Sequence, residues 1–239
     1  MTDPQLPANA TDSPLHVWGG AGGGVPSIRQ RRYPVIVADP PWHFVTYSNK
    51  GQGKGAQQHY PTMSVDEIAS LPVSRIAAAN CILLLWATWP NIQDALRVGA
   101  AWGFEFKTLA FDWVKRSSTG KSLHTGLGYY TRSNSEPCLL FRRGKMPELK
   151  SRSVHQVIET DENPGLPGFE EVLSSRIAAH SKKPEEFYHR VEQLLDGPYL
   201  ELFSRLQRPG WQAIGDEIDG QDISAALLCE IESLLEDKP

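Results

Sequence analysis

The sequence predicts an α/β fold with a parallel sheet, and three observations lead to this prediction. Short apolar runs, typical of strands buried on both faces, occur at 34–38 and 81–86. Segments with helical spacing and recognisable ends lie between runs of this kind. The chain has 239 residues, of which 40% are hydrophobic, so it can bury one sizeable core as a single domain.

The first third of the chain contains one strand and one short helix. Residues 1–30 are rich in Pro, Gly, Ala, Asn and Ser, and we expect this segment to be disordered or flexible. The strand at 34–38 leads into a polar, glycine-rich stretch at 45–58, which is too long for a simple connection and is a candidate lid. Ser64 and Glu67 have the spacing of a capping box and start a short helix.

The predicted folded domain covers residues 31–218. The strand at 81–86 precedes a helix from about Asn91 to Trp102, which Gly103 ends. A later helix begins at 183–186, with proline and two acids in its first turn. The remaining strands are expected at 107–114, 137–141, 154–159 and 199–203.

The C-terminal segment, residues 219–239, predicts an acidic amphipathic helix. Its apolar residues recur at helical spacing: Ile223, Ala226, Leu227, Ile231, Leu234 and Leu235. In the simpler interpretation this helix packs onto its own domain. The alternative is a contact with a partner subunit or a second copy, and hence a possible homodimer.

Composition narrows the class of protein. No hydrophobic stretch is long enough to span a membrane, and the N-terminus lacks the features of a signal peptide. Cys81, Cys138 and Cys229 are widely spaced among apolar neighbours, which indicates buried thiols rather than disulfides or a zinc site. The seven histidines show no metal-ligand spacing. We therefore expect a metal-free protein of the cytoplasm.

The net charge of −4 conceals a basic segment at 115–152, which contains nine Lys or Arg residues and two acids. Glycine, serine and aromatic residues are interleaved with the cations. Mobile cationic loops with stacking groups suit a phosphate backbone and an extruded base, so this segment predicts nucleic-acid contact. Arg142 and Arg143 are expected to contribute to it. The alternative is a solvated loop that binds nothing.

Asp39-Pro40-Pro41-Trp42 directly follows the first strand. A parallel strand delivers its last residue to the carboxyl edge of the sheet, where open α/β sheets bind ligands, so Asp39 would stand there as an acceptor. Pro40 and Pro41 have a fixed φ and no N–H, and we expect their carbonyls to face no competing amide donor. Trp42 offers a flat surface on which a base can stack. The alternative is an ordinary turn with Trp42 in the core.

This set of groups suits methylation of an exocyclic amino group. The lone pair of such an amine is delocalised into the base ring, so the amine is a poor nucleophile. A carboxylate and a fixed carbonyl that accept its two N–H groups favour a pyramidal nitrogen with an available lone pair. Because the electrophile is a sulfonium methyl group, orientation and preorganised electrostatics suffice.

A second polar region follows the strand at 199–203. Ser204, Arg205 and Gln207 lie where a cofactor would sit, in the same crevice as Asp39. Lys183, at the start of a helix, can pair with a carboxylate. The alternative for Lys183 is a solvated surface lysine.

Further motifs stand in a fixed order around Asp39-Pro40-Pro41-Trp42. They are His59-Tyr60-Pro61-Thr62-Met63-Ser64, Leu84-Leu85-Trp86-Ala87-Thr88, Trp113-Val114-Lys115, Glu136-Pro137-Cys138-Leu139-Leu140, Lys183-Pro184-Glu185-Glu186, Glu201-Leu202-Phe203-Ser204-Arg205 and Pro209-Gly210-Trp211. With them, the chain from about Arg32 to Glu217 resembles the DPPW-type adenine-N6 methyltransferases, the family of the catalytic subunit of the eukaryotic messenger-RNA adenosine methyltransferase. The prokaryotic and phage branch is the most similar.

The resemblance implies S-adenosylmethionine as methyl donor, no metal, and a Rossmann-like fold with its motifs in circularly permuted order. Asp39 and the Pro40 carbonyl would hold the N6 amine, in a catalytic motif completed by Pro41 and Trp42. The positions that match substrate-binding residues are Tyr60, Trp113 and Glu136, although a core tryptophan explains Trp113 equally well. Those that match cofactor-binding residues are Lys183, Phe203, Arg205, Asp216 and Glu217.

One position departs from the family pattern, which usually has asparagine where this chain has Asp216. An ionised aspartate accepts a hydrogen bond from a ribose hydroxyl but cannot donate one. We expect a modest change in cofactor affinity.

The function that the resemblance implies is site-specific methylation of adenine N6 in DNA, with the target base flipped into the site. Methylation of RNA is the alternative within the same chemistry. A non-catalytic nucleic-acid-binding partner is an alternative of another class, which the intact motif at Asp39 opposes. A cytosine amino-methyltransferase is a further rival, although such enzymes more often end the equivalent motif in tyrosine or phenylalanine.

Overall fold

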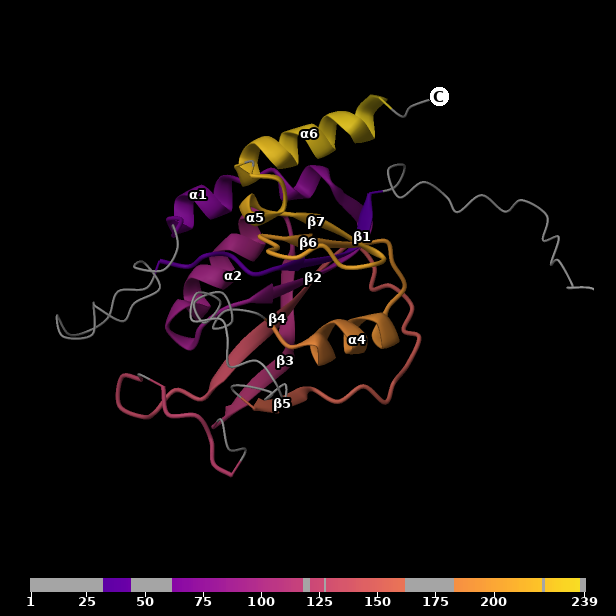
Figure 1. The fold of residues 1–239 in the computed structure, drawn as a ribbon. Coiled ribbons are helices and arrows are strands. Elements are labelled where there is room, and N and C mark those ends of the chain that lie inside the picture. The colour runs from indigo at the N-terminus through magenta and orange to yellow at the C-terminus, as the bar shows by residue number, and fades with distance from the viewer. Residues whose placement is uncertain are drawn as a thin grey trace, which may run out of the picture.

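The computed structural model describes residues 32–43, 62–117, 121–126, 128–161, 183–220 and 222–236 (Figure 1). The segment at 1–30, the candidate lid at 45–58 and the predicted site residue Tyr60 lie outside these residues. The described residues form an α/β fold around a seven-stranded sheet, in the order β5-β3-β4-β2-β1-β6-β7.

The strands and helices follow the predicted order. The strands are β1 (Tyr33–Ala38), β2 (Ala77–Trp86), β3 (Glu105–Arg116), β4 (Ser135–Arg143), β5 (Val157–Asp161), β6 (Tyr199–Leu202) and β7 (Trp211–Ile214). The helices are α1 (Val65–Ser70), α2 (Ile92–Ala101), α4 (Glu185–Leu194), α5 (Asp216–Asp219) and α6 (Ile223–Glu236), with 3-10 turns η4 (Val73–Arg75) and η5 (Trp89–Asn91). Strand β7 was not among the expected elements.

The sheet is parallel except at β4. Strand β1 pairs in parallel with β2 and β6, β6 with β7, and β3 with β5, whereas β4 is antiparallel to both of its neighbours. The carboxyl ends of the other strands therefore meet the beginning of β4 along one side of the sheet, here called the carboxyl edge. The α/β, Rossmann-like fold that was predicted is confirmed, with β4 as the one antiparallel strand of this sheet.

Helices cover both faces of the sheet, as Figure 1 shows. Side chains alternate along β1, so that Ile36 packs in the core beneath α1, α2 and α6, whereas Val35 and Val37 pack in the core beneath α4. Burial on both faces explains why the strands are continuous apolar runs. Helix α6 contributes Leu227 and Ile231 to the first core, which confirms that it packs onto its own domain.

Local signals in the sequence form the helix ends. Ser64 Oγ accepts from the Glu67 amide at 3.2 Å, and the Glu67 carboxylate accepts from the Ser64 amide at 2.7 Å, which completes the predicted capping box. Gly103 follows α2 with a φ of 84°, a conformation that favours glycine.

The three cysteines are unpaired, and their environments differ from one another. Cys81 and Cys138 are buried as expected, and burial raises the pKa of the Cys81 thiol to about 12. Cys229 is exposed on the outer side of α6, so the expectation of a buried thiol was wrong there. Among the described helices, none has the length and apolar character needed to cross a membrane.

Candidate active site

Several strands bring their polar ends together at the carboxyl edge. Asp39 follows β1, and its amide donates to the carbonyl of Leu202 at the end of β6, at 3.4 Å. Glu136, at the start of β4, pairs with Trp113 of β3. The reversed direction of β4 is what delivers Glu136 to the same edge as Asp39.

Four charged side chains form the centre of this edge, and we call them the charged cluster: Asp39, Lys115, Glu136 and Lys183. The Lys183 ammonium donates to Asp39 Oδ2 at 2.7 Å and lies 3.4 Å from Glu136 Oε2. Lys115 forms an ion pair with the other oxygen of Glu136. The side chain of Lys183 is only 8% exposed, so the alternative of a solvated surface lysine was wrong.

The charges of this cluster stabilise one another. Burial by itself raises the pKa of Glu136, but Lys183 and Lys115 outweigh it and hold that pKa below its usual range. Burial by itself lowers the pKa of Lys183, but Asp39 and Glu136 hold it above its usual range. Glu136 and Lys183 are therefore both ionised at neutral pH.

Two tryptophans form the wall behind the cations. The Lys183 ammonium lies 5.2 Å from the centre of the Trp86 ring, and the Lys115 ammonium lies 4.4 Å from that of Trp113. The Trp113 indole donates to Thr160 Oγ1 at 2.5 Å, which fixes its orientation. Trp113 is 8% exposed, so it belongs to the core and the site at once.

The turn after Asp39 differs from expectation in two respects. Trp42 is 6% exposed and its indole donates to the Trp86 carbonyl at 2.9 Å, so it lies in the core and offers no open stacking surface. The Pro40 carbonyl accepts from the Trp42 amide at 2.8 Å, and the Pro41 carbonyl accepts from the Met63 amide at 3.0 Å. Both carbonyls thus have amide donors: the first lies in a tight turn at Trp42, and the second faces Met63, which forms a parallel bridge with Trp42.

Phe203 opens the loop between β6 and β7, here called the cofactor loop (residues 203–210). It has a φ of 62°, which is unusual for a residue other than glycine and costs on the order of 1 kcal/mol. The Ser204 amide donates to the Ile214 carbonyl at 3.1 Å, which ties the loop to β7. Such strain often marks a ligand site.

Two segments that carry predicted cofactor residues, the cofactor loop and the start of α5, meet at Ser204 and Gly215. A side chain at Gly215 would lie 2.1 Å from the Ser204 carbonyl oxygen, so these two backbones are in direct contact. Asp216 follows, exposed, at the start of α5, and Arg205 is half-buried. Glu217 belongs to α5, but its side chain lies outside what the structure describes.

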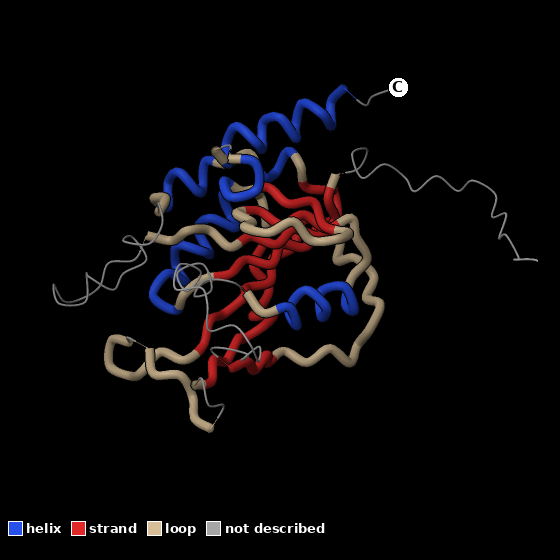
Figure 2. The backbone as a smooth tube through the Cα atoms, viewed as in Figure 1, coloured by secondary structure: helices blue, strands red, loops and turns tan. Residues whose placement is uncertain are grey.

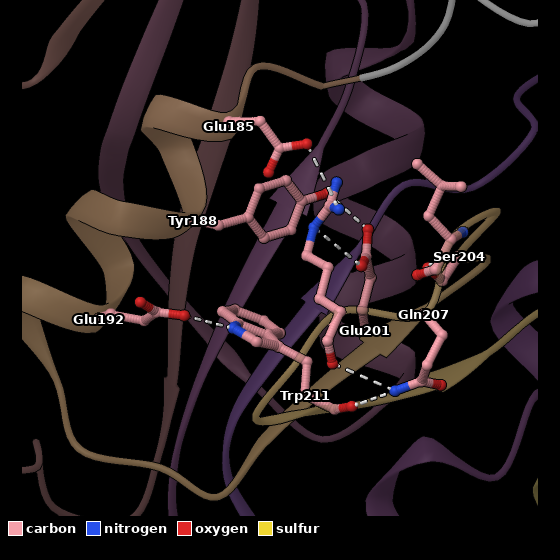
Figure 3. A network of polar contacts seen from close by, with 9 residues as sticks. Glu185, Tyr188, Glu192, Glu201, Ser204, Gln207 and Trp211 are labelled. Carbon is pink, nitrogen blue, oxygen red and sulfur yellow. Dashed lines mark hydrogen bonds and ion pairs between the residues drawn. The ribbon is translucent and has the colours of Figure 1, made fainter.

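A second polar network lies beneath the cofactor loop, and we did not predict it (Figure 3). The Tyr188 hydroxyl donates to Glu201 at 2.6 Å, and the Arg208 guanidinium stacks 3.7 Å from the centre of the Tyr188 ring. Burial raises the pKa of Glu201, although Tyr188 and Arg208 partly oppose this. A carboxylate inside the otherwise apolar strand 199–203 was the signal that could have revealed it.

The basic segment at 115–152 is divided between the two sides of the sheet. Lys115 belongs to the charged cluster. Arg142 and Arg143 end β4 on the opposite side, where Arg142 pairs with Glu105 and Arg143 donates to the Ser74 carbonyl. Strand β4 therefore carries Arg142 and Arg143 away from the carboxyl edge, and their contact with nucleic acid stays a prediction.

Among the described residues, no group of three or more His, Cys, Asp or Glu side chains is arranged to hold a metal ion.

Comparison with known proteins agrees with the arrangement of this edge. The MT-A70 family model matches residues 33–217, from β1 to the start of α5. The chain belongs to the MT-A70 family. This match covers all of the predicted site residues and confirms the resemblance read from the motifs.

Individual relatives of this MT-A70 chain include bacterial and animal proteins. The type II methyltransferase M.MunI of a Mycoplasma species is 30% identical over 224 residues, which are 87% of each chain. The human N(6)-adenine-specific methyltransferase METTL4 is 29% identical, and the human N(6)-adenosine-methyltransferase catalytic subunit METTL3 is 25% identical. Each of these two alignments covers 79% of this chain but only 38% of METTL4 and 29% of METTL3.

Proposed function

We propose that this protein uses S-adenosylmethionine to methylate the N6 amine of adenine in DNA, with the target base flipped out of the helix. The observation that carries the proposal is the position of Asp39, whose carboxylate is held by Lys183 at the edge where the cofactor loop also lies. The side chain of Asp39 is 25% exposed, so it remains accessible to a ligand. A cytoplasmic location agrees with such a substrate.

Asp39 and Pro40 have the acceptor capacity that the amine requires. A carboxylate offers about four lone-pair sites, of which Lys183 uses one at Oδ2. The Pro40 carbonyl has a second lone pair beyond the one that the Trp42 amide occupies. Together they can accept both N–H groups of the amine. As a nitrogen–carbon bond forms and a sulfur–carbon bond breaks, the Asp39 carboxylate would take up the proton that the methylated nitrogen releases.

The side chains around Asp39 fit S-adenosylmethionine, which supplies a methyl group on a positively charged sulfur. The two carboxylates and two ammonium groups of the charged cluster balance one another, so the cluster offers partners both for the cationic sulfur and for the carboxylate of this cofactor. The Lys183 ammonium has three donors, of which these two carboxylates engage two, and the third can bind the cofactor's carboxylate. Phe203, Arg205 and Asp216 would hold the remainder, with Asp216 accepting from a ribose hydroxyl.

DNA is favoured over RNA because of the relative that this chain covers almost completely, the type II methyltransferase M.MunI. The similarity to METTL3 leaves RNA as the second candidate. A non-catalytic role is opposed by the intact charged cluster.

The test is transfer of labelled methyl from S-adenosylmethionine to duplex DNA, single-stranded DNA and RNA in parallel, followed by nucleoside analysis. N6-methyladenine formed in DNA supports the proposal. N6-methyladenine formed only in RNA would mean that the substrate is RNA and not DNA. Cofactor binding without methyl transfer to any polymer would point to a missing partner or a narrow target sequence. If neither methyl transfer nor cofactor binding were detected, the non-catalytic role would be supported instead.

The contact between Gly215 and Ser204 gives a prediction about the cofactor site. Gly215→Ala places a carbon 2.1 Å from the Ser204 carbonyl oxygen, so the cofactor loop must move. We expect the Kd for S-adenosylmethionine to rise about tenfold, since overpacking typically costs about 1–3 kcal/mol. Calorimetric titration measures it.

Gly103→Ala is the control, because it also strains a backbone with positive φ (84°), lies outside the cofactor loop, and brings a side chain no closer than 4.0 Å to Ser74. It should lower stability and leave the Kd nearly unchanged. An unchanged Kd in Gly215→Ala would show that the loop does not contact the cofactor.

A further inference from the structure

The connection between β3 and β4 folds into two antiparallel arms that project from the carboxyl edge (Figure 2). In the first, Arg116 bridges to Leu123, and the His124 amide donates to the Lys115 carbonyl at 2.8 Å. In the second, Gly126 bridges to Ser133, and its amide donates to the Ser133 carbonyl at 2.9 Å. The expected mobile loop is therefore hydrogen-bonded, and we call its second arm, residues 126 and 128–133, the tyrosine hairpin.

Two tyrosines occupy the tip of this hairpin. Tyr130 is 93% exposed and Tyr129 is 69% exposed, and their ring centres lie 4.9 Å apart at an angle of 72°. Two adjacent aromatic rings that are exposed to water do not add the free energy of apolar burial to the stability of the fold. They therefore indicate a surface that binds a ligand or a partner molecule.

The backbone segments at the tip of the tyrosine hairpin approach one another closely. A side chain at Gly128 would lie 1.9 Å from the Thr131 carbonyl oxygen, and one at Gly126 would lie 2.6 Å from the Ser133 carbonyl oxygen. Glycine at both positions allows the backbone to close this turn. The tyrosines are thus carried on a defined structure rather than on a loose loop.

The base of the hairpin adjoins the proposed active site. A hollow there is lined by Lys115, His124, Gly126, Ser133, Asn134, Ser135 and Glu136. Lys115 and Glu136 also belong to the charged cluster, so a chain of ion pairs connects this hollow with Asp39. A base held at Asp39 would have its polynucleotide beside the tyrosines.

The charge of the segment suits a polyanion. Residues 121–134 contain Lys121, His124 and Arg132 and no aspartate or glutamate. Cationic groups that flank exposed aromatic rings bind phosphates and stack on bases at the same time. Duplex DNA fits best, because a base that leaves the helix uncovers the faces of its neighbours, which apolar or aromatic wedges can cover.

We propose that the tyrosine hairpin enters the DNA duplex beside the target adenine, where Tyr129 and Tyr130 stack on the bases that the flipped nucleotide uncovers. This inference rests on the proposed function. The partner of this hairpin is then a DNA duplex that opens at the target adenine.

The experiment first maps N6-methyladenine in plasmid DNA propagated with the protein, which identifies the target sequence. Wild type, Tyr130→Ala and Tyr130→Phe are then compared on three substrates: a matched duplex, a duplex with an abasic site opposite the target adenine, and the single strand. We expect kcat/KM of Tyr130→Ala on the matched duplex to fall about tenfold, the size of one lost base–aromatic stack. Tyr130→Phe, which keeps the ring, should retain activity.

The other substrates test the role in duplex opening. On the abasic duplex and the single strand, where no partner base has to be displaced, Tyr130→Ala should approach wild type. Equal losses on all three substrates, or wild-type activity on the matched duplex, would overturn the inference.

Leu228→Ala, which truncates a 47% exposed residue on α6, is the control for loss of a surface side chain. It should match wild type on all three substrates. Absence of methylation by wild type itself would instead refute the proposed function, so the two failures are distinguishable.

Discussion

Asp39→Ala is expected to lower methyl transfer by about a thousandfold, while S-adenosylmethionine still binds. Asp39 presents its carboxylate at the carboxyl edge, fixed by Lys183 at 2.7 Å, where it would accept an N–H of the amine. Without this acceptor the amine loses both its orientation and the group that takes its proton. Single-turnover methylation of DNA and calorimetric binding of the cofactor measure the two effects separately.

Two further variants sharpen this result. Asp39→Asn keeps the size and one acceptor oxygen but loses the charge, so we expect a loss nearly as large as for alanine. Asp66→Ala removes an exposed carboxylate that pairs with Arg97 far from the site, and it should leave transfer unchanged. If Asp39→Ala weakened cofactor binding as much as transfer, Asp39 would be a cofactor ligand instead of the amine holder.

Lys183→Met should destabilise the fold by about 3–5 kcal/mol at pH 7, in addition to weakening cofactor binding. Lys183 is 8% exposed and neutralises Asp39 and Glu136, so its removal leaves two carboxylates with only Lys115 nearby. Urea unfolding measures the loss. Lys150→Met is the matched control, because Lys150 pairs with Asp196 at the surface, where solvent screens the pair and its loss should change stability little.

The loss of folding stability in Lys183→Met depends on pH, and the pKa shifts of Glu136 and Lys183 give the direction of this dependence. The depressed pKa of Glu136 contributes stability above the ordinary pKa of about 4.3, and this stability is lost as pH falls through the depressed value. The raised pKa of Lys183 contributes stability below about 10.4, which is lost as pH rises through the raised value. The deficit of Lys183→Met should therefore be large at pH 7 and shrink towards pH 4, where the unpaired carboxylates become protonated. A deficit that is the same at both pH values would contradict this electrostatic role.

The fold could be predicted from the sequence where one signal dominates locally. The apolar runs at β1 and β2 and the capping box at Ser64 needed no knowledge of tertiary structure. Strand β7 has four residues, including polar Gln212, and exists because β6 provides a pairing edge. The direction of β4 is likewise a property of the pairing and is not encoded within the strand.

Two positions could be predicted from the sequence: Asp39 lies at the carboxyl edge, and Lys183 pairs with a carboxylate. Trp42 was expected to offer a stacking surface but lies in the core. Its indole donates to the Trp86 carbonyl, which is 44 residues away in the chain and could not be paired with it from the sequence. Lys115 was recognised only as part of a basic segment, since its ion pair with Glu136 crosses from β3 to β4. Ring and charge partners from distant strands are not visible in a linear pattern.

Because β4 runs antiparallel to β3, the connection over the site and the strands that carry the charged cluster are separate parts of the structure. A parallel neighbour requires a crossover that returns to the opposite side of the sheet, whereas an antiparallel one needs only a turn at the edge where β3 ends. The connection over the site can therefore gain, lose or exchange residues without altering any strand register below it. In this architecture the choice of target sequence can diversify in a surface appendage, while the residues that we propose to hold the amine stay bound to the sheet.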